Sequence, residues 1–248
     1  MKISLLTVSY NSASTIGDTI QSVIAQDYPD IEYIIVDGNS NDGTQEIIQS
    51  YQHKVSKWIS EPDQGIYEAM NKAIKLATGD VVGIINSDDF YADNNVLSKV
   101  AEKLNEASVD AVYGDLVYVD PNNLKRVVRK YSSRNWKPEK FAWGFMPAHP
   151  TFFVKRSCYE KAGLFKTDYK IAADYEMLIR LLYVHRVTHA YIPENLVVMR
   201  KGGVSSNGIN SNIILNREIL RACLENGIST NYVKIYSKYF RKVFELFK

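Results

Sequence analysis

Apolar and polar positions alternate in blocks along the first 85 residues, and the blocks have the lengths of strands and helices in turn. Short runs rich in β-branched residues predict buried strands, and segments with apolar positions three or four apart predict helices between them. The predicted strands are 3–9, 31–36, 55–60 and 81–85, and the predicted helices are 14–25, 42–48 and 65–77. This alternation predicts an α/β fold with a Rossmann-like, mostly parallel central sheet and helices on both faces.

The second half of the chain has a more mixed pattern. Two β-rich runs separated by Asp120-Pro121-Asn122-Asn123 predict a hairpin. The remaining segments are an irregular aromatic stretch at 136–150, a short strand at 151–154, and helices at 97–104, 173–183 and 209–225. We find no internal repeat and no low-complexity tract.

Composition and charge narrow the classes of protein that fit this pattern. The chain has 248 residues, 46% of them hydrophobic, which is enough for one large domain with a sizeable core. A net charge of +2 gives no overall attraction to nucleic acid, so we expect no nucleic-acid partner.

Cysteine usage and the apolar runs bear on the compartment. The two cysteines, Cys158 and Cys223, lie far apart without metal-ligand spacing, so we expect buried thiols and a reducing compartment. The first ten residues lack the features of a signal peptide, and no apolar run approaches the ~18 residues of a membrane span. We therefore expect a cytoplasmic protein, with the inner face of the plasma membrane as a candidate location.

Polar clusters follow each of the four predicted strands of the first half. They are Ser9-Tyr10-Asn11, Asp37-Gly38, Glu61-Pro62-Asp63 and Ser87-Asp88-Asp89. The carboxyl ends of parallel strands meet at one edge of a sheet, and ligands bind there. The sequence therefore predicts a binding site at this edge.

Asp88 and Asp89 are the candidate metal ligands. Two adjacent carboxylates after an apolar strand repel one another and are costly to desolvate, and a divalent cation relieves that cost. Mn²⁺ or Mg²⁺ held by one or two carboxylates takes its other ligands from water and phosphate oxygens, and it would neutralise charge on a leaving diphosphate. The alternative is a solvated turn or a cap for the following helix.

Four other carboxylates are candidates for ligand contact or catalysis. At a strand end, Asp37 and Asp63 can accept hydrogen bonds from a base or a ribose, or they can serve turns and caps alone. Asp174 and Glu176 begin a predicted helix, where they either interact with the helix dipole or include a general base. Their spacing does not decide between the two.

Two basic side chains are also candidates. His149 is either structural or a contact to a diphosphate or an acceptor. Arg200 begins the run Arg200-Lys201-Gly202-Gly203, which is either a loop that closes over phosphates or a plain surface loop.

These motifs together resemble the family 2 glycosyltransferases, which are inverting enzymes of the GT-A fold, and most of all the bacterial members that build surface polysaccharides. The matching segments are 7–11, 36–44, 61–67, 86–89, 149–153 and 173–176. They extend over roughly residues 1–205, and their order and spacing are specific. One departure is that Ser87-Asp88-Asp89 stands where the family has Asp-X-Asp, which blurs which carboxylate holds the metal.

The resemblance implies a role for each matching position. The base, usually uracil, would be held by Thr7, Ser9, Tyr10, Asn11 and Asp37, with help from Asp63. Asp88 would lie near the ribose and diphosphate, Asp89 would bind the metal, and Asp174 would be the catalytic base. The reaction would move a sugar from a nucleotide diphosphate, a UDP-sugar, to a hydroxyl of a lipid-linked or saccharide acceptor, with inversion.

The resemblance also suggests a division of the chain. Residues 1–205 would form the GT-A domain, with a nucleotide-binding half up to about residue 110 and an acceptor half from 111. Residues 206–248 would form a helical extension.

A nucleotide-sugar binding module without catalysis is the alternative function, and it would not need Asp89 or Asp174. A dinucleotide-dependent oxidoreductase is disfavoured because the first strand is not followed by G-x-G-x-x-G.

The segment 232–248 carries a separate signal. One helical face would gather Val233, Tyr236, Tyr239, Phe240, Val243, Phe244 and Phe247, and positive charge comes from Lys234, Lys238, Arg241, Lys242 and Lys248. A basic amphipathic helix rich in aromatic residues is typical of an anionic membrane interface. The alternatives are a helix docked on the core of its own domain and a homodimer contact.

Overall fold

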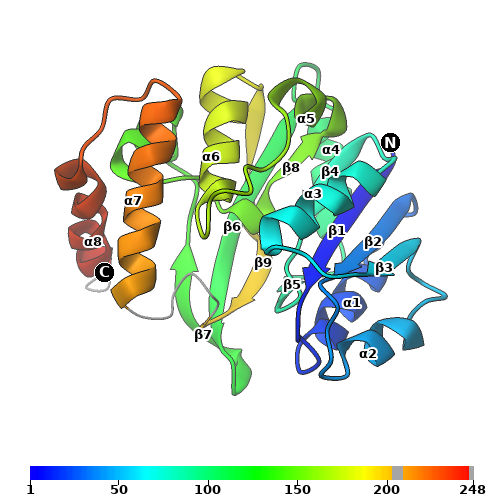
Figure 1. Ribbon diagram of the computed structural model, residues 1–248. Helices are drawn as coiled ribbons and strands as arrows, with labels where there is room; N and C mark the ends of the chain where they lie inside the picture. The colour runs from blue at the N-terminus through cyan, green and yellow to red at the C-terminus, as the bar shows by residue number, and fades with distance from the viewer. Residues whose placement is uncertain (203–208, 246–248) are drawn as a thin grey trace.

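One sheet, curled and flanked by helices, organises the computed structural model, which describes residues 1–202 and 209–245 (Figure 1). The described strands are β1 (Ile3–Ser9), β2 (Ile31–Asp37), β3 (Lys57–Ser60), β4 (Val81–Ile84), β5 (Asp89–Tyr91), β6 (Ala111–Asp120), β7 (Asn123–Tyr131), β8 (Phe153–Lys155) and β9 (His189–Arg200). Their order is β3-β2-β1-β4-β8-β6-β9-β5, and β7 pairs with β6 at the side of this path.

The first four strands confirm the predicted parallel arrangement. β1 pairs in parallel with β2 and β4, and β2 with β3, in a register that aligns Ser9 with Asp37 and Asp37 with Ser60. The connecting helices are α1 (Ile16–Ile24), α2 (Thr44–Ser50) and α3 (Ile66–Leu76). The carboxyl ends of these strands therefore lie at one edge, as predicted.

Helices cover both faces of this parallel part because side chains alternate along each strand. On one face, Leu6 and Val8 of β1 share a core with Met70 of α3. On the other face, Leu5 shares a second core with Ile20 of α1. The two cores account for the near-continuous apolar runs of these strands, which are buried on both sides.

Beyond β4 the sheet is mixed, and here the sequence pattern was less informative. β8 runs antiparallel to β4 and β6, and β9 runs parallel to β6 and antiparallel to β5. The predicted hairpin is confirmed as β6 and β7. The strands β5 and β9 and the helix α5 (Arg156–Ala162) were not predicted. The other helical segments are α4 (Val96–Leu104), two 3₁₀ turns η1 (Pro138–Trp143) and η2 (His149–Thr151), and α6 (Ala173–Ile179), which continues as the π-helix η3 (Arg180–Val184).

The last two helices pack on the second half of the domain. Helix α7 (Ile209–Glu225) matches the predicted 209–225 and places Ile219 and Cys223 in the same core as α6. Helix α8 (Tyr232–Glu245) contacts η1 and α7, buries Ile235 and leaves Val233 81% exposed. Of the helices in the described ranges, none has both the length and the apolar character needed to cross a membrane.

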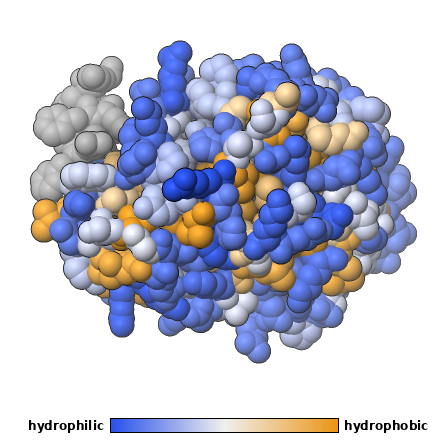
Figure 2. Space-filling model, turned by 90° about the horizontal axis from the view of Figure 1, so that it is seen from above, coloured by the Kyte–Doolittle hydropathy of each residue, from blue (hydrophilic) through white to orange (hydrophobic). Residues whose placement is uncertain are grey.

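The face of the molecule at the top of Figure 1, where β1 begins, is covered mostly by hydrophilic side chains with apolar patches between them (Figure 2). The loops that follow the parallel strands lie at the opposite end. The polar clusters that follow the predicted strands lie in those loops.

Candidate active site

Asp37 is the centre of the loops at the strand ends. Its side chain is fully buried, and its two oxygens accept four hydrogen bonds. The donors are the Ser9 hydroxyl at 2.9 Å, the Ser60 hydroxyl at 2.7 Å, and the Ser40 amide and hydroxyl at 2.9 and 2.5 Å. Four bonds fill the acceptor capacity of a carboxylate. Asp37 therefore holds the loops that follow β1, β2 and β3 together, and its oxygens are already occupied by these hydrogen bonds rather than free for the expected contact with a base.

The side chains of Tyr10 and Asp63 lie close to Gly38, which has no side chain to separate them. A methyl group added to Gly38 would lie 2.7 Å from an Asp63 carboxylate oxygen and 3.3 Å from the Tyr10 ring. The Tyr10 side chain is 65% exposed, and the other Asp63 oxygen accepts the Gly65 amide at 2.9 Å. An exposed aromatic face beside a carboxylate oxygen can stack on a base and accept its N–H group.

The loop after β1 is tied to its neighbours on both sides. Asn11 has a positive φ of 48° and donates its amide to the Ser40 hydroxyl at 2.8 Å. Ser12 and Ser87 join their hydroxyls at 2.8 Å, which links this loop to the one that precedes Asp88. Thr7 differs from the expectation, because it is fully buried and its hydroxyl pairs with Tyr33 at 3.1 Å. The structure therefore keeps the Thr7 side chain away from the surface of the site.

Asp89, at the start of β5, is fully buried and only partly satisfied. One oxygen accepts the Asn86 side-chain amide at 3.2 Å, whereas the other Asp89 oxygen and the side-chain oxygen of Asn86 have no hydrogen-bond partner within the described ranges. Burial, and then the neighbouring Asp88, raise the pKa of Asp89 well above its usual range. Burial raises the pKa of Asp88 too, against the opposing charge of Arg200. The charge of Arg200 therefore does not offset the cost of burying these two carboxylates.

These residues fit a divalent metal ion. Carboxylate and amide oxygens are the ligands that Mg²⁺ and Mn²⁺ prefer, and two unpaired buried oxygens are available here. Among the residues that the structure describes, no group of three or more His, Cys, Asp and Glu side chains could hold a metal by itself. An ion here would need further ligands from water or from substrate phosphates, as Mg²⁺ commonly does.

Arg200 brings a cation to the same loop from the end of β9. Its guanidinium donates to the Asp88 carbonyl oxygen at 2.6 Å, pairs with Asp18, and lies 5.2 Å from the Phe90 ring. Since Arg200 is largely buried in these contacts, the structure fixes its charge beside Asp88. The predicted phosphate loop continues through Lys201 and Gly202, and Gly203 lies outside the described residues.

Asp174 lies in the first turn of α6 and is partly buried. Burial raises its pKa to about 6, although the Tyr175 amide, which donates to the carboxylate at 2.7 Å, opposes the shift. The preceding segment contacts the start of α3, because the Tyr67 hydroxyl donates to the Ile171 carbonyl oxygen at 2.5 Å. A pocket of about 390 Å³ lies between residues 64–68 and 167–170. A carboxyl group with this pKa is ionised at neutral pH and can accept a proton.

Comparison with known proteins decides the family. The profile described as "Glycosyl transferase family 2" matches residues 4–162. The chain belongs to this family. The glycosyltransferase is 30% identical over 185 residues to an uncharacterized glycosyltransferase of Mycobacterium tuberculosis H37Rv, covering 73% of this chain and 69% of the relative. It is 27% identical over 207 residues to the PGL/p-HBAD biosynthesis glycosyltransferase of Mycobacterium bovis BCG, covering 76% and 75%.

Solved structures show the fold to be that of GT-A glycosyltransferases. Staphylococcus aureus TarS 1–349 in complex with UDP-GlcNAc superposes with a TM-score of 0.71 at 21% identity, over 90% of this glycosyltransferase and 67% of TarS. The mannosyltransferase PcManGT of Pyrobaculum calidifontis, in complex with GDP-Man and Mn²⁺, gives a TM-score of 0.67 at 19% identity, over 90% and 63%.

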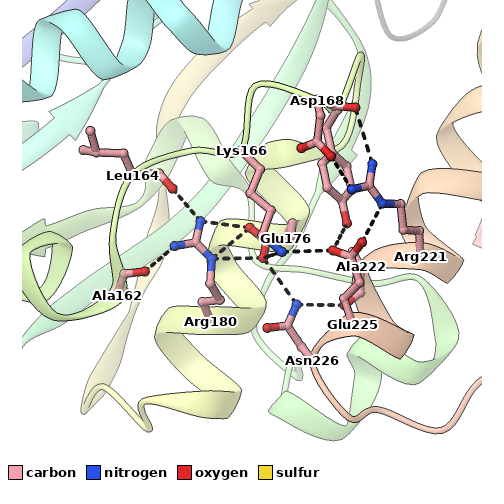
Figure 3. A network of polar contacts seen from close by, with 11 residues as sticks. Ala162, Leu164, Lys166, Asp168, Glu176, Arg180, Arg221, Ala222, Glu225 and Asn226 are labelled. Carbon is pink, nitrogen blue, oxygen red and sulfur yellow. Dashed lines mark hydrogen bonds and ion pairs between the residues drawn. The ribbon is translucent and has the colours of Figure 1, made fainter.

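Glu176 has a different place in the glycosyltransferase from the one expected. It is fully buried and pairs with Arg180 at 2.9 Å and with Lys166 at 3.0 Å. Arg180 also donates to two backbone carbonyl groups, and the network continues to Glu225 and Arg221 of α7 (Figure 3). The expected contact between Glu176 and an acceptor is therefore corrected to a structural ion pair that joins α6 to its neighbours.

For His149, the structure favours the structural alternative. It is buried, its ring packs edge-on against Phe165 at 5.9 Å, and burial lowers its pKa to about 4. The imidazole is therefore neutral at physiological pH and offers no positive charge to a diphosphate.

Some residues that build the site were missed at the sequence level. Ser40 and Ser60 complete the bonds of Asp37, and Asn86 supplies an unpaired oxygen beside Asp89. The spacing Asp37-x-x-Ser40 is a turn signal that would have identified Ser40. The carboxylate of Glu218 on α7 contacts the loop that precedes Asp174. It has no local sequence signal because α7 and this loop are far apart in the sequence.

Proposed function

We propose that this glycosyltransferase transfers a sugar, with inversion, from a nucleotide diphosphate, most simply a UDP-sugar, to an acceptor hydroxyl. The observation that carries the proposal is the set of hydrogen bonds that joins the loops at the strand ends. Asp37 joins the loops that follow β1, β2 and β3, and the Ser12–Ser87 contact adds the loop that follows β4. The unpaired oxygens of Asn86 and Asp89 lie in that last loop and at the start of β5. Neighbours of the same fold in complex with UDP-GlcNAc and with GDP-Man support a nucleotide-sugar donor.

The donor would lie along this edge. We assign the base to the surface formed by Tyr10 and Asp63 above Gly38, with Ser9, Asn11 and Asp37 supporting the loop beneath it. The diphosphate would lie beside Asp88, where Arg200 offers a fixed positive charge. This assignment gives the nucleotide-binding half to residues 1–110 and the acceptor half to 111–205.

A divalent ion would be held by Asp89, with Asn86 and Asp88 as neighbours. The Mn²⁺ complex of the Pyrobaculum mannosyltransferase supports this choice, and either Mn²⁺ or Mg²⁺ suits oxygen ligands. When bound, such an ion neutralises negative charge on the departing diphosphate.

The chemistry left to the protein is proton transfer and orientation. The Asp174 carboxylate accepts the proton of the acceptor hydroxyl, and the hydroxyl oxygen forms a bond to the anomeric carbon on the face opposite the diphosphate. The bond between that carbon and the diphosphate oxygen breaks, and the electron pair leaves with the nucleotide. A pKa of about 6 keeps most of Asp174 ionised at pH 7 while leaving it a useful base.

Helix α8 suggests where the acceptor is found. Its outer side exposes Tyr232, Val233 and Tyr236, and the Lys234 ammonium lies 5.8 Å from the ring of the half-exposed Trp143. Aromatic, apolar and basic groups together suit an anionic membrane surface, so we propose peripheral attachment at the inner face and a lipid-linked acceptor in surface-polysaccharide synthesis. The predicted contacts of residues 240–248 lie outside the described side chains. A homodimer contact is the alternative for the exposed side.

The decisive experiment is a donor panel. UDP-sugars and GDP-mannose are incubated with Mn²⁺ and the purified protein, with water as the acceptor; nucleotide release is followed, and the anomer of the released sugar is assigned by NMR before it mutarotates. We expect release from one donor class, an inverted anomer, and a loss of at least ~10²-fold in Asp174→Asn. Binding of a donor without release would favour the nucleotide-sugar binding module instead.

A further inference from the structure

Glu218 of α7 makes an unusual set of contacts with the backbone. Its carboxylate is 9% exposed and accepts three successive amides, those of Lys170 at 2.7 Å, Ile171 at 2.9 Å and Ala172 at 2.9 Å. Hydrogen bonds to an ionised acceptor are roughly twice as strong as neutral ones, so three of them hold a loop firmly.

The same loop is held from the opposite side by α3. Tyr67 donates its hydroxyl to the Ile171 carbonyl oxygen at 2.5 Å, and Asn71 exchanges two hydrogen bonds with the Phe165 backbone at 2.8 and 2.9 Å. Helix α3 follows directly on the loop that contains Asp63. The segment 165–172 therefore lies between one helix of the nucleotide half and one helix from the end of the chain.

Asp174 follows this segment by two residues. Ala172 precedes the first residue of α6, and its amide would have no helical partner without Glu218. The Ala172 carbonyl oxygen accepts a helical hydrogen bond from the Glu176 amide at 3.1 Å, so holding the Ala172 amide constrains where the turn that carries Asp174 begins.

We propose that Glu218 is a positioning residue for catalysis, which holds the 170–172 backbone so that Asp174 meets the acceptor hydroxyl. The proposal rests on the proposed function, in which Asp174 is the base. It assigns a role in the reaction to α7, which lies beyond the residues 4–162 matched by the family.

Glu218 also acts on Asp174 through its charge. Of the groups that face Asp174, Tyr67 comes from α3 and Glu218 from α7. Burial is the largest cause of the raised pKa of Asp174, backbone hydrogen bonds oppose it, and the negative charge of Glu218 adds a smaller contribution in the raising direction. Removal of that charge lowers the pKa. A residue that only stabilised the fold would lower the amount of active protein and leave the pH dependence unchanged.

The chain offers a matched control in Glu225, about two turns further along α7. Its carboxylate accepts hydrogen bonds from the Lys166 ammonium and the Tyr169 hydroxyl, each at 2.9 Å, and from the Arg221 guanidinium at 2.6 Å. These partners are side chains, so Glu225→Gln removes a comparable carboxylate from the same helix without releasing the backbone before Asp174.

The test compares Glu218→Gln, Glu218→Ala, Glu225→Gln and Asp174→Asn in the full chain, with Mn²⁺ and the donor of highest turnover in the panel. For Glu218→Ala we expect kcat to fall by about 10- to 100-fold, as a displacement of about 1 Å allows, while KM for the donor changes less than about twofold. For Glu218→Gln we expect the acid limb of the kcat profile to move to lower pH. Glu225→Gln should keep both kcat and the limb.

Amide exchange tests the contact independently of turnover. Exchange at residues 170–172 should quicken at least ~10-fold in Glu218→Ala and stay unchanged in Glu225→Gln. Unchanged amide exchange in Glu218→Ala would overturn the role of Glu218. So would a change of kcat in the Glu218 variants no larger than that in Glu225→Gln, with the acid limb of the kcat profile unmoved. If Asp174→Asn were itself fully active, the proposed function would fail instead, so the two failures are distinguishable.

Discussion

The pH dependence of turnover follows from the burial of Asp174. Burial raises its pKa from the ordinary 3.8 to about 6, and only the ionised form can accept a proton. The ionised fraction is about 90% at pH 7, about half at pH 6 and about 10% at pH 5, from the titration curve of one group. The rate should therefore fall about tenfold between pH 7 and pH 5.

The assay is kcat between pH 5 and 8 at saturating donor and Mn²⁺. At saturation, the proposed site at Asp88 and Asp89 is occupied by Mn²⁺ and the donor, so the titration of these two carboxylates does not enter the profile. We expect a single acid limb with a midpoint near 6 and a slope of one. The residual activity of Asp174→Asn should lack this limb. A wild-type limb near pH 4, or a limb that persists in Asp174→Asn, would refute the assignment of the base.

Three further predictions address the donor surface, the fold and the membrane. Gly38→Ala should weaken UDP binding at least ~10-fold in calorimetry, because its methyl group would lie 2.7 Å from an Asp63 oxygen and displace it; unchanged affinity would exclude the proposed base surface. Burial alone would raise the pKa of Glu32, but hydrogen bonds from two hydroxyls and an amide lower it to about 2 from 4.5, so its stabilisation is complete above pH 4.5 and is lost as pH falls towards 2. Glu32→Gln should cost about 2–3 kcal/mol in urea unfolding at pH 7 and flatten the curve of stability between pH 5 and 2, and a curve parallel to the wild type would contradict this. Deleting 232–248, or replacing the 81% exposed Val233 with Glu, should lower binding to anionic liposomes several-fold and leave catalysis in solution intact, whereas equal binding would count against a membrane role for α8.

The parallel part of the fold was predictable because its signals are local. The strands β1, β2 and β4 are apolar runs buried on both faces, and a polar cluster follows each of the first four strands. The parallel arrangement and the binding edge therefore followed from general rules of α/β sheets. In β9, Pro193, Glu194 and Asn195 interrupt the apolar pattern. In β5 only three residues pair, and the first is Asp89. Patterns this short or this polar do not distinguish a strand from a loop.

The roles of individual side chains were less predictable, because they depend on contacts distant in sequence. Asp37 looked like a ligand residue, but hydroxyls of Ser9, Ser40 and Ser60 occupy its oxygens. The spacing of Asp174 and Glu176 did not distinguish them, and only the family resemblance singled out Asp174 as the base. Residues two apart on a helix do not share a face. Asp174 can therefore be partly exposed while Glu176 is fully buried in its ion pair with Arg180.

The metal-dependent binding of a nucleotide at the strand ends is the central claim, and calorimetry of UDP with and without Mn²⁺ tests it most directly. The proteins to compare are the wild type, Asp89→Asn and the control Asp93→Asn, whose exposed carboxylate pairs with Lys99 on the surface. We predict that Mn²⁺ tightens UDP binding at least ~10-fold, about 1.4 kcal/mol, in the wild type and in Asp93→Asn, and has no effect in Asp89→Asn. Mn²⁺-dependent binding that survives in Asp89→Asn, or UDP binding by the wild type that ignores Mn²⁺, would contradict the account.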